Sequence, residues 1–296
     1  MALNDAAVIT PGAGYIYVAN PGTLPPTPAA LKTLDPLLFG AQHITLTMTG
    51  TPTAGKWTVK STAAETPVDV PFDASGPKIA ELVASLPSIG AGNVTYVSGG
   101  PLLSTPVVLA FAGKLQGKTV PLTIVSTGLS GGTTPAVSSV TSTAPNGWSI
   151  VGHTSLENLP ELAYEGGDTE TKGTWQRKAL REVEKEAISD HMTVQIQQFD
   201  SSSLKLYYGK NNSTTAGVFG VKGGSAPVNE KAILTIIVDG DVRLGHYVPR
   251  SNVRRDEAIK LSGEDFATLP IRATFLQLGS QDLYSWINED LFPVEP

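Results

Sequence analysis

Three glutamates alternate along a short stretch of the chain, at Glu182, Glu184 and Glu186. Successive side chains of a β-strand point to opposite faces, so a strand would present these three carboxylates on one side. Such a face could line a channel and repel phosphate groups, which would let DNA pass without sticking. The propensities over 176–188 also favour a helix, in which Glu182 and Lys185 would form a solvated pair. Both interpretations remain open from the residues alone.

Paired carboxylates are also the groups that glycosidases use, so a glycan-cleaving enzyme is one hypothesis. Acid pairs are common in any chain with 27 acidic residues, however. A Gly-Lys-Thr triplet within Gly113–Thr119 lacks the first glycine of a phosphate-binding loop, because Ala112 stands in its place. The four histidines have no metal-ligand spacing: His43, His153, His191 and His246. We therefore expect no catalytic residue, no cofactor, no metal and no enzymatic activity.

The polar stretch from Glu165 to Trp175 is typical of a mobile loop. An insertion of this length inside a β domain needs a reason, and a contact that becomes ordered on assembly would supply one. Trp175 is a plausible anchor for such a contact, although a plain hairpin tip remains the alternative. The residues assigned to this contact are Glu165, Gly166, Gly167, Asp168, Glu170, Lys172 and Trp175.

A short helix is predicted over Leu204–Tyr208, because Asp200-Ser201-Ser202-Ser203 can cap its start and Gly209 can end it. We expect its apolar side chains to pack in the core, with interface stacking of the tyrosines as the alternative: Leu204, Leu206, Tyr207 and Tyr208. Downstream, Asp239-Gly240 between two apolar runs predicts a β-hairpin.

Composition predicts a mainly β protein, since the 30 glycines and 22 prolines favour strands and turns. The formal charge is −6, from 21 basic and 27 acidic residues, and is the wrong sign for a protein that grips DNA. No cysteine is present, which excludes disulfides and cysteine-ligated zinc. The longest apolar runs, such as Ala232–Val238, are too short to span a bilayer.

The chain reads as one domain, residues 1–41 and 146–296, interrupted by a β-rich module over 42–145. The module has 5 basic and 4 acidic residues, a net charge of +1. The outer domain therefore has 16 basic and 23 acidic residues, a net charge of −7. Within the module, Ile79, Leu82 and Val83 have helical spacing, and short apolar runs predict strands around that helix. Residues 126–145 are predicted to be a Gly/Ser/Thr/Pro linker, and Trp148–His153 a strand.

The order of these elements resembles that of major tail tube proteins of long-tailed phages. The likeness is carried by Val151–Ser155 with Glu157–Pro160, by Tyr164–Asp168, by Leu204–Gly209, and by Glu264–Phe266 leading to Leu269–Ile271. The opening Ala2–Tyr15 is similar to the start of tail proteins from phages of actinobacteria. The likeness covers about residues 1–41 and 146–296.

The resemblance implies a β-sandwich with a flanking helix, whose copies form rings, usually of six, that stack into a hollow, non-contractile tail tube. The loop after Glu165 would contact the next ring, the three glutamates would face the lumen, and the inserted module would lie outside. DNA would pass through the lumen without specific binding. Partners would be further copies, the tape measure protein and other tail proteins, in a virion whose parts are made in the host cytoplasm.

The main alternative is a phage or cell-surface adhesion protein that binds host glycans through the 42–145 module. Glycan binding by the module alone would favour adhesion, whereas tubes visible by electron microscopy would favour the structural role.

Overall fold

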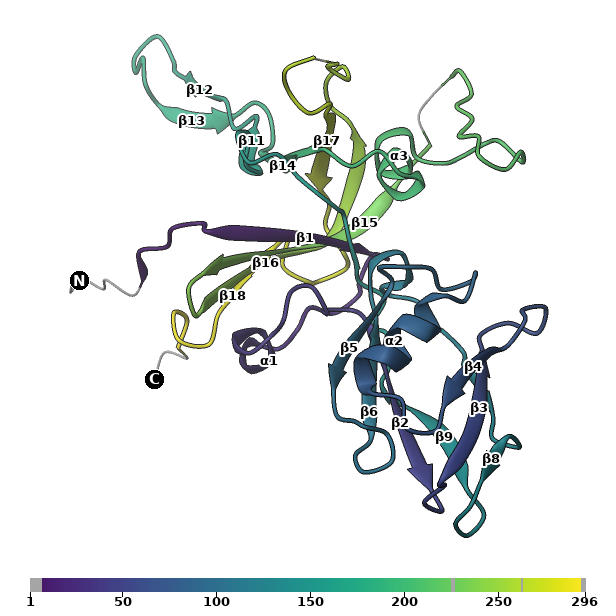
Figure 1. Cartoon of the computed structure of the whole chain (residues 1–296). Helices are drawn as coiled ribbons and strands as arrows, with labels where there is room; N and C mark the ends of the chain where they lie inside the picture. Colours follow the sequence, from purple (N-terminus) through teal and green to yellow (C-terminus); the bar gives the residue numbers. More distant parts are fainter. Residues whose placement is uncertain (1–6, 225–226, 262, 294–296) are drawn as a thin grey trace. The chain divides into compact units, whose positions relative to one another are not determined.

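A computed structural model describes residues 7–224, 227–261 and 263–293, and the chain divides into two compact units (Figure 1). The first unit contains Met1–Thr33 and Val151–Pro296, and the second contains Leu34–Ile150. The second unit therefore begins before residue 42 and ends after residue 145. Both units are mainly β, which confirms the predicted fold class.

The strands of the first unit pair antiparallel in the order β1-β15-β16-β17-β14-β11, and β18 pairs with β16. Their bounds are β1 (Ala13–Ala19), β11 (Glu161–Glu165), β14 (Ser189–Ile196), β15 (Glu230–Asp239), β16 (Val242–Arg255), β17 (Leu269–Phe275) and β18 (Ser285–Ile287). Strands β15 and β16 form the predicted hairpin around Gly240, since Asp239 pairs with Val242.

The sheet of the first unit folds over on itself, so that β14 lies across the core from β15. The Thr235 hydroxyl on β15 donates to the Met192 sulfur on β14 at 3.7 Å. Successive side chains of a strand point to opposite faces, so alternate residues of several strands fill the space between the layers. These residues are Ile16, Met192, Val194, Ile233, Val248, Ile271 and Ala273. The short helix α1 (Pro28–Lys32) places Leu31 next to Gly245 on β16.

Helix α3 (Ser201–Tyr208) begins at Asp200, whose carboxylate accepts from the backbone N–H groups of Ser202 and Ser203 at 2.8 and 2.9 Å. It ends at Gly209, where a φ of 88° suits glycine. Leu206 and Tyr207 are buried in the core of the first unit. The predicted cap and stop of this helix are both confirmed.

The second unit is a β-sandwich closed by one α-helix. One sheet has the order β5-β6-β2-β9, and the other β4-β3-β7 with β8 on β3. The bounds are β2 (Gln42–Thr49), β3 (Ala54–Lys60), β4 (Val68–Pro71), α2 (Gly76–Ala84), β5 (Val94–Ser98), β6 (Val107–Phe111), η2 (Gly113–Leu115), β7 (Thr123–Val125), β8 (Leu129–Ser130), β9 (Ala136–Thr143) and β10 (Ser149–Ile150). Leu46, Trp57, Ile79 and Leu109 are fully buried where the two sheets and α2 meet.

Two sequence predictions in this part of the chain were wrong. Residues 126–145 are not a linker, because they include β9, which pairs with β2 over seven residues from His43 to Thr49 and buries Val137. The serines and threonines of this segment are common in linkers, but they are also compatible with a strand at the edge of a sheet, which is the position of β9. The strand predicted over Trp148–His153 is reduced to the two residues of β10.

Candidate assembly surface

Strand β11 is the last strand of its sheet, so among the described residues its outer edge has no strand partner. An unpaired edge presents free N–H and C=O groups that another chain can bind. Tyr164 on this strand is 69% exposed, and Leu162 on the same face is also exposed. The first unit therefore has an open, partly apolar sheet edge of the kind that natural monomers usually protect.

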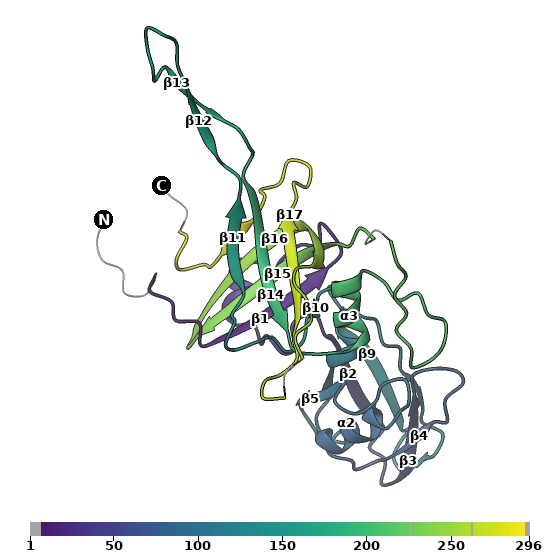
Figure 2. The same cartoon turned by 90° about the horizontal axis from the view of Figure 1, so that it is seen from above.

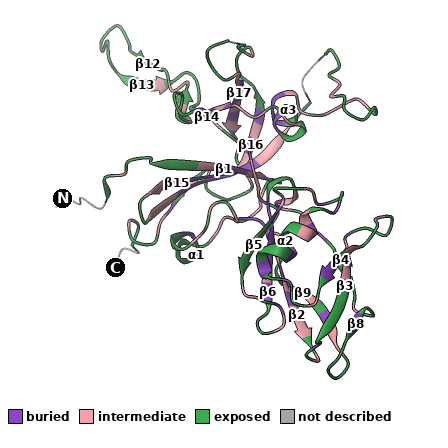
Figure 3. Ribbon diagram, in the orientation of Figure 1, coloured by how far each residue is buried: buried purple, intermediate pink, exposed green. Residues whose placement is uncertain are grey.

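A two-stranded arm, residues 166–188, extends β11 and β14 beyond the sheet (Figure 2). It contains β12 (Thr169–Lys172) and β13 (Arg181–Glu184), which pair antiparallel. Nearly all residues of the arm are exposed, from its root to its tip (Figure 3). The expected loop over Glu165–Trp175 therefore includes strand β12 and forms one half of a hairpin. The stretch was not predicted to be a strand, because the residues of β12 are polar on both faces.

Two glycines connect the arm to the sheet. Gly166 and Gly167 both have a φ of 80°, in the left-handed region that other residues adopt only with strain. A Cβ on Gly166 would also lie 2.4 Å from the carbonyl oxygen of Ala187. The pairing of β11 with β14 ends at this point, and that of β12 with β13 begins two residues later.

At the tip of the arm, Thr174 and Arg177 exchange backbone hydrogen bonds of 2.7 and 3.0 Å, closing a turn with Trp175 and Gln176 at its centre. The Trp175 side chain is 95% exposed. Four basic residues and no acid occupy the ten residues around it: Lys172, Arg177, Lys178 and Arg181. No ion pair joins any of the four to another described residue.

The expected lumen-facing acids lie on the stem of this same arm. Glu182 and Glu184 are in β13, so residues 181–184 form a strand and not the alternative helix. They share a face with Thr171 and Thr169, their cross-strand partners, and the Thr169 hydroxyl donates to Glu182. Glu186 follows the end of β13, and all three glutamates are exposed.

An ion pair anchors the root of the arm. Arg272 on β17 lies 2.5 Å from the Glu165 carboxylate and 3.0 Å from the His191 ring. The hydrogen bond from Arg272 holds the pKa of Glu165 below its usual range. The role of Arg272 could not be predicted from the sequence, because its neighbours in sequence do not show that β17 and β11 flank the same strand, β14.

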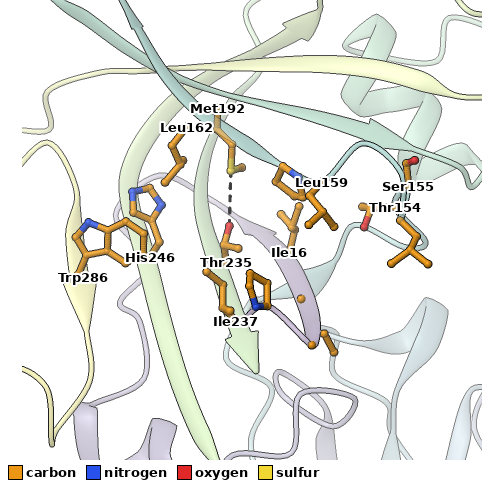
Figure 4. Close-up of a pocket in the computed structure, with 16 residues that line it drawn as sticks. Ile16, Thr154, Ser155, Leu159, Leu162, Met192, Thr235, Ile237, His246 and Trp286 are labelled. Carbon is orange, nitrogen blue, oxygen red and sulfur yellow. Dashed lines mark hydrogen bonds between the residues drawn. The ribbon is translucent and has the colours of Figure 1, made fainter. Parts of the chain in front are cut away.

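An apolar cavity of about 260 Å³ opens between the folded layers of the first unit (Figure 4). Ile16, Thr235 and Ile237 face it from β1 and β15, and Leu162 and Met192 face it from β11 and β14. Leu156 and Leu159, from the segment before β11, lie at its exposed rim. The polar side chains around it include no Lys or Arg.

His246 lines this cavity and is only 2% exposed, and its Nδ1 atom has no hydrogen-bond partner among the described residues. The centroid of its ring lies 4.7 Å from that of the Trp286 ring. Burial lowers the pKa of His246 to about 4, so the imidazole is neutral at pH 7 and has one acceptor nitrogen. No motif in the sequence marks this site, since a lone histidine in a strand is usually structural.

The residues of α3 do not line this cavity, and the apolar side chains of the helix pack in the core of the first unit. Tyr207 is buried and donates its hydroxyl to the Glu257 carbonyl at 2.7 Å. Tyr208 packs edge-on against it at 4.7 Å, and Leu204 is half-buried beside the same core. In the described part of the chain, no cluster of three or more potential metal ligands is present, and no helix is long and apolar enough to cross a membrane.

Comparison with known proteins gives three matches to phage tail proteins, one of which spans the whole chain. A family model described as phage tail tube protein matches residues 1–66 and 122–296. The major tail protein Gp23 of Mycobacterium phage D29 is 37% identical over 296 residues, covering 100% of this chain and 98% of the relative. Gp23 of Mycobacterium phage L5 is 54% identical over 152 residues, covering 51% of this chain and 76% of the relative. The chain therefore belongs to the phage tail tube protein family, as a structural component of the virion tail and not an enzyme.

Proposed function

We propose that copies of this chain close into rings, six to a ring, that stack into a hollow tube without a contractile sheath. The open edge of β11 is the observation that carries the proposal. A ring in which each sheet pairs with the next would satisfy the free backbone groups of that edge, just as barrels remove edges altogether. The exposed Tyr164 and Leu162 would be covered in the same step.

The arm supplies a contact along the tube axis in this proposal. Its residues add almost nothing to the core of their own subunit, since nearly all are exposed. A two-stranded ribbon of this kind is only marginally stable alone, so packing against a copy in the next ring would stabilise it. The tape measure protein and other tail proteins would complete the tail.

The acidic face of the arm stem would face the bore. Glu182 and Glu184 share that face with two threonines, and Lys172 and Arg181 occupy the opposite face. A ring of copies would then present carboxylates and hydroxyls to passing DNA. Phosphates would be repelled and not held, because attraction at each ring would slow the ejected genome.

Electron microscopy and sedimentation of the purified chain test assembly directly. We expect rings and tubes from the unaltered chain, and few or none from Tyr164→Lys, because a charge on an edge strand opposes pairing. Val140→Lys, at an exposed position of β9 in the second unit, is the matched control. Monomers alone at high concentration, with the protein absent from virion tails, would contradict the proposal.

Charge reversal tests the lining of the bore. Tubes of the double variant Glu182→Lys, Glu184→Lys should retain labelled double-stranded DNA at low salt and release it as salt rises. The control is Asp73→Lys, Glu81→Lys, which changes the charge equally at exposed positions of the second unit. Equal retention by both variants would place the arm acids outside the bore.

A further inference from the structure

The lining of the cavity in the first unit is suited to receive an aromatic side chain. Its walls are mostly aliphatic, and about 260 Å³ is ample for one aromatic side chain, since benzene enters a protein cavity of about 150 Å³. A buried nitrogen without a partner is costly in such surroundings. Nδ1 of His246 is such an atom, and His246 is among the residues that line the cavity.

Trp175 has the complementary chemistry. Its indole is large and apolar and carries a single N–H group that donates but cannot accept. At 95% exposure, it is also the most exposed of the large hydrophobic side chains in the described residues. The arm projects away from the sheet whose strands line the cavity (Figure 2), so an indole that enters the cavity would come from another copy.

The charges around the two surfaces also match. Trp175 is surrounded by Lys172, Arg177, Lys178 and Arg181. The rim of the cavity has acids close by in sequence: Glu157 lies between Leu156 and Leu159, Glu161 precedes Leu162, and Asp239 follows Ile237 by two positions. Opposite charges around an apolar contact favour one orientation and speed encounter more than they add affinity.

We propose that the cavity is a receptor for the arm of a second copy: the Trp175 indole enters it, the His246 ring turns to bring its buried Nδ1 to the cavity, and the indole donates its N–H to that atom. The basic tip then lies against the acids of the rim. The two surfaces are different patches of the same chain, so the contact is head-to-tail and continues from copy to copy without closing. This inference rests on the proposed tube, and it identifies a residue pair that connects one ring to the next.

Three substitutions at Trp175 and the cavity test the pairing in the full-length chain. Trp175→Ala should raise the subunit concentration needed for tubes roughly 30-fold, the effect of losing a central anchor residue. Trp175→Phe should give a smaller rise, because the ring fills the cavity but lacks the N–H. His246→Leu should weaken tube formation by chains that carry Trp175, because the hydrogen bond to Nδ1 is lost. It should not weaken tube formation further in chains that carry Trp175→Phe, because phenylalanine has no N–H group to make that bond. Sedimentation or microscopy of the assembled fraction measures each effect.

Crosslinking tests the same contact without relying on assembly yield. The chain has no cysteine, so a mixture of Gln176→Cys and Leu156→Cys copies can form a disulfide between the two variants only where tip and rim meet. Gln176→Cys with Ser202→Cys, on the exposed first turn of α3, is the control. The inference predicts a heterodimer band in the first mixture and not in the second.

The outcomes separate this pairing from the tube itself. Tubes that form normally from Trp175→Ala, together with no disulfide between positions 176 and 156, would overturn the pairing while the tube stands. Failure of the unaltered chain to assemble, with no disulfide in either mixture, would overturn both. A disulfide in the first mixture with loss of tubes from Trp175→Ala supports the pairing.

Discussion

His246 shows how a single residue takes its properties from the fold. In the sequence it is one of four scattered histidines with no motif around it. Folding of the sheet places it between Thr235, Trp286 and Phe275 with 2% of its surface exposed. The neighbouring cavity is lined by His246 together with four other titratable groups, Tyr164, Asp190, His191 and Tyr284. The centroid of the Tyr284 ring lies 5.4 Å from that of His246. The burial of His246 could not be predicted, because it depends on strands about 40 residues apart in sequence.

Stability should fall between pH 6.5 and 4 because of this residue. The pKa of His246 is about 4 in the folded chain and 6.5 in the unfolded chain, so the unfolded state binds the proton first as pH falls. The contribution is fully present above pH 6.5, declines as pH falls, and amounts to about 3 kcal/mol when complete. Denaturant unfolding at pH 7.5, 5.5 and 4 measures it.

His246→Gln should remove this part of the pH dependence, since an amide does not titrate. The matched control is His153→Gln, at an exposed histidine of the first unit, which should retain the wild-type profile. Identical slopes for the wild type and His246→Gln would show that other groups cause the loss of stability.

At the scale of the element, α3 and the arm show what local sequence does and does not determine. The cap, apolar face and glycine stop of α3 lie within ten residues, so the sequence predicted the helix and its end at Gly209, although the helix begins at Ser201 and not at Leu204. The arm is mostly polar, and the alternating glutamates at 182, 184 and 186 fit a strand and a solvated helix equally well. Its strands form because β11 and β14 bring its two ends together, a constraint from distant residues.

Asp200→Ala should destabilise the first unit by about 1–2 kcal/mol, because the first N–H groups of α3 lose the acceptor that caps them. Asp200→Asn retains a capping oxygen and should recover most of the loss. Urea unfolding measures both variants, and equal stability of Asp200→Ala and wild type would show that the cap contributes nothing.

Removing the arm should leave the fold intact and abolish stacking. In the variant, residues 168–185 are replaced by Asn-Gly; the Gly167 N–H already donates to the Glu186 carbonyl at 2.9 Å, so the ends are adjacent. We expect a melting temperature within a few degrees of wild type, since the arm buries almost nothing. Circular dichroism and microscopy measure the two effects, and normal tubes would exclude the arm from ring stacking.

For the whole molecule, the division into two units is the main organising fact. Composition and charge indicated that a second module interrupts the first unit, because both change where the Thr/Gly/Ser-rich sequence begins near residue 42. They did not locate its ends: the structure places the unit at Leu34–Ile150, and the tail tube family model leaves only 67–121 unmatched. The unit has its own core, with Leu46, Trp57 and Leu109 fully buried, which composition does not reveal.

A chain that joins Thr33 to Val151 through about ten Gly/Ser residues should fold and assemble. The first unit keeps its own core in this variant, and a flexible linker of that length spans about 17 Å. Circular dichroism and electron microscopy of the shortened chain give the measurement. Aggregation would show that the first unit depends on the second, and folded subunits without tubes would place the second unit in the assembly contacts.

Gly166 and Gly167 have a mechanical consequence for the proposed tail. If each arm tip is held by a neighbouring copy, any curvature of the tail changes the distance between tip and sheet, and the softest backbone between them is this pair of glycines. Bending stiffness would then be set by two residues in each subunit. Alanine at Gly166 would change more than this stiffness, because its Cβ would lie 2.4 Å from the carbonyl oxygen of Ala187 and the root of the arm would have to shift.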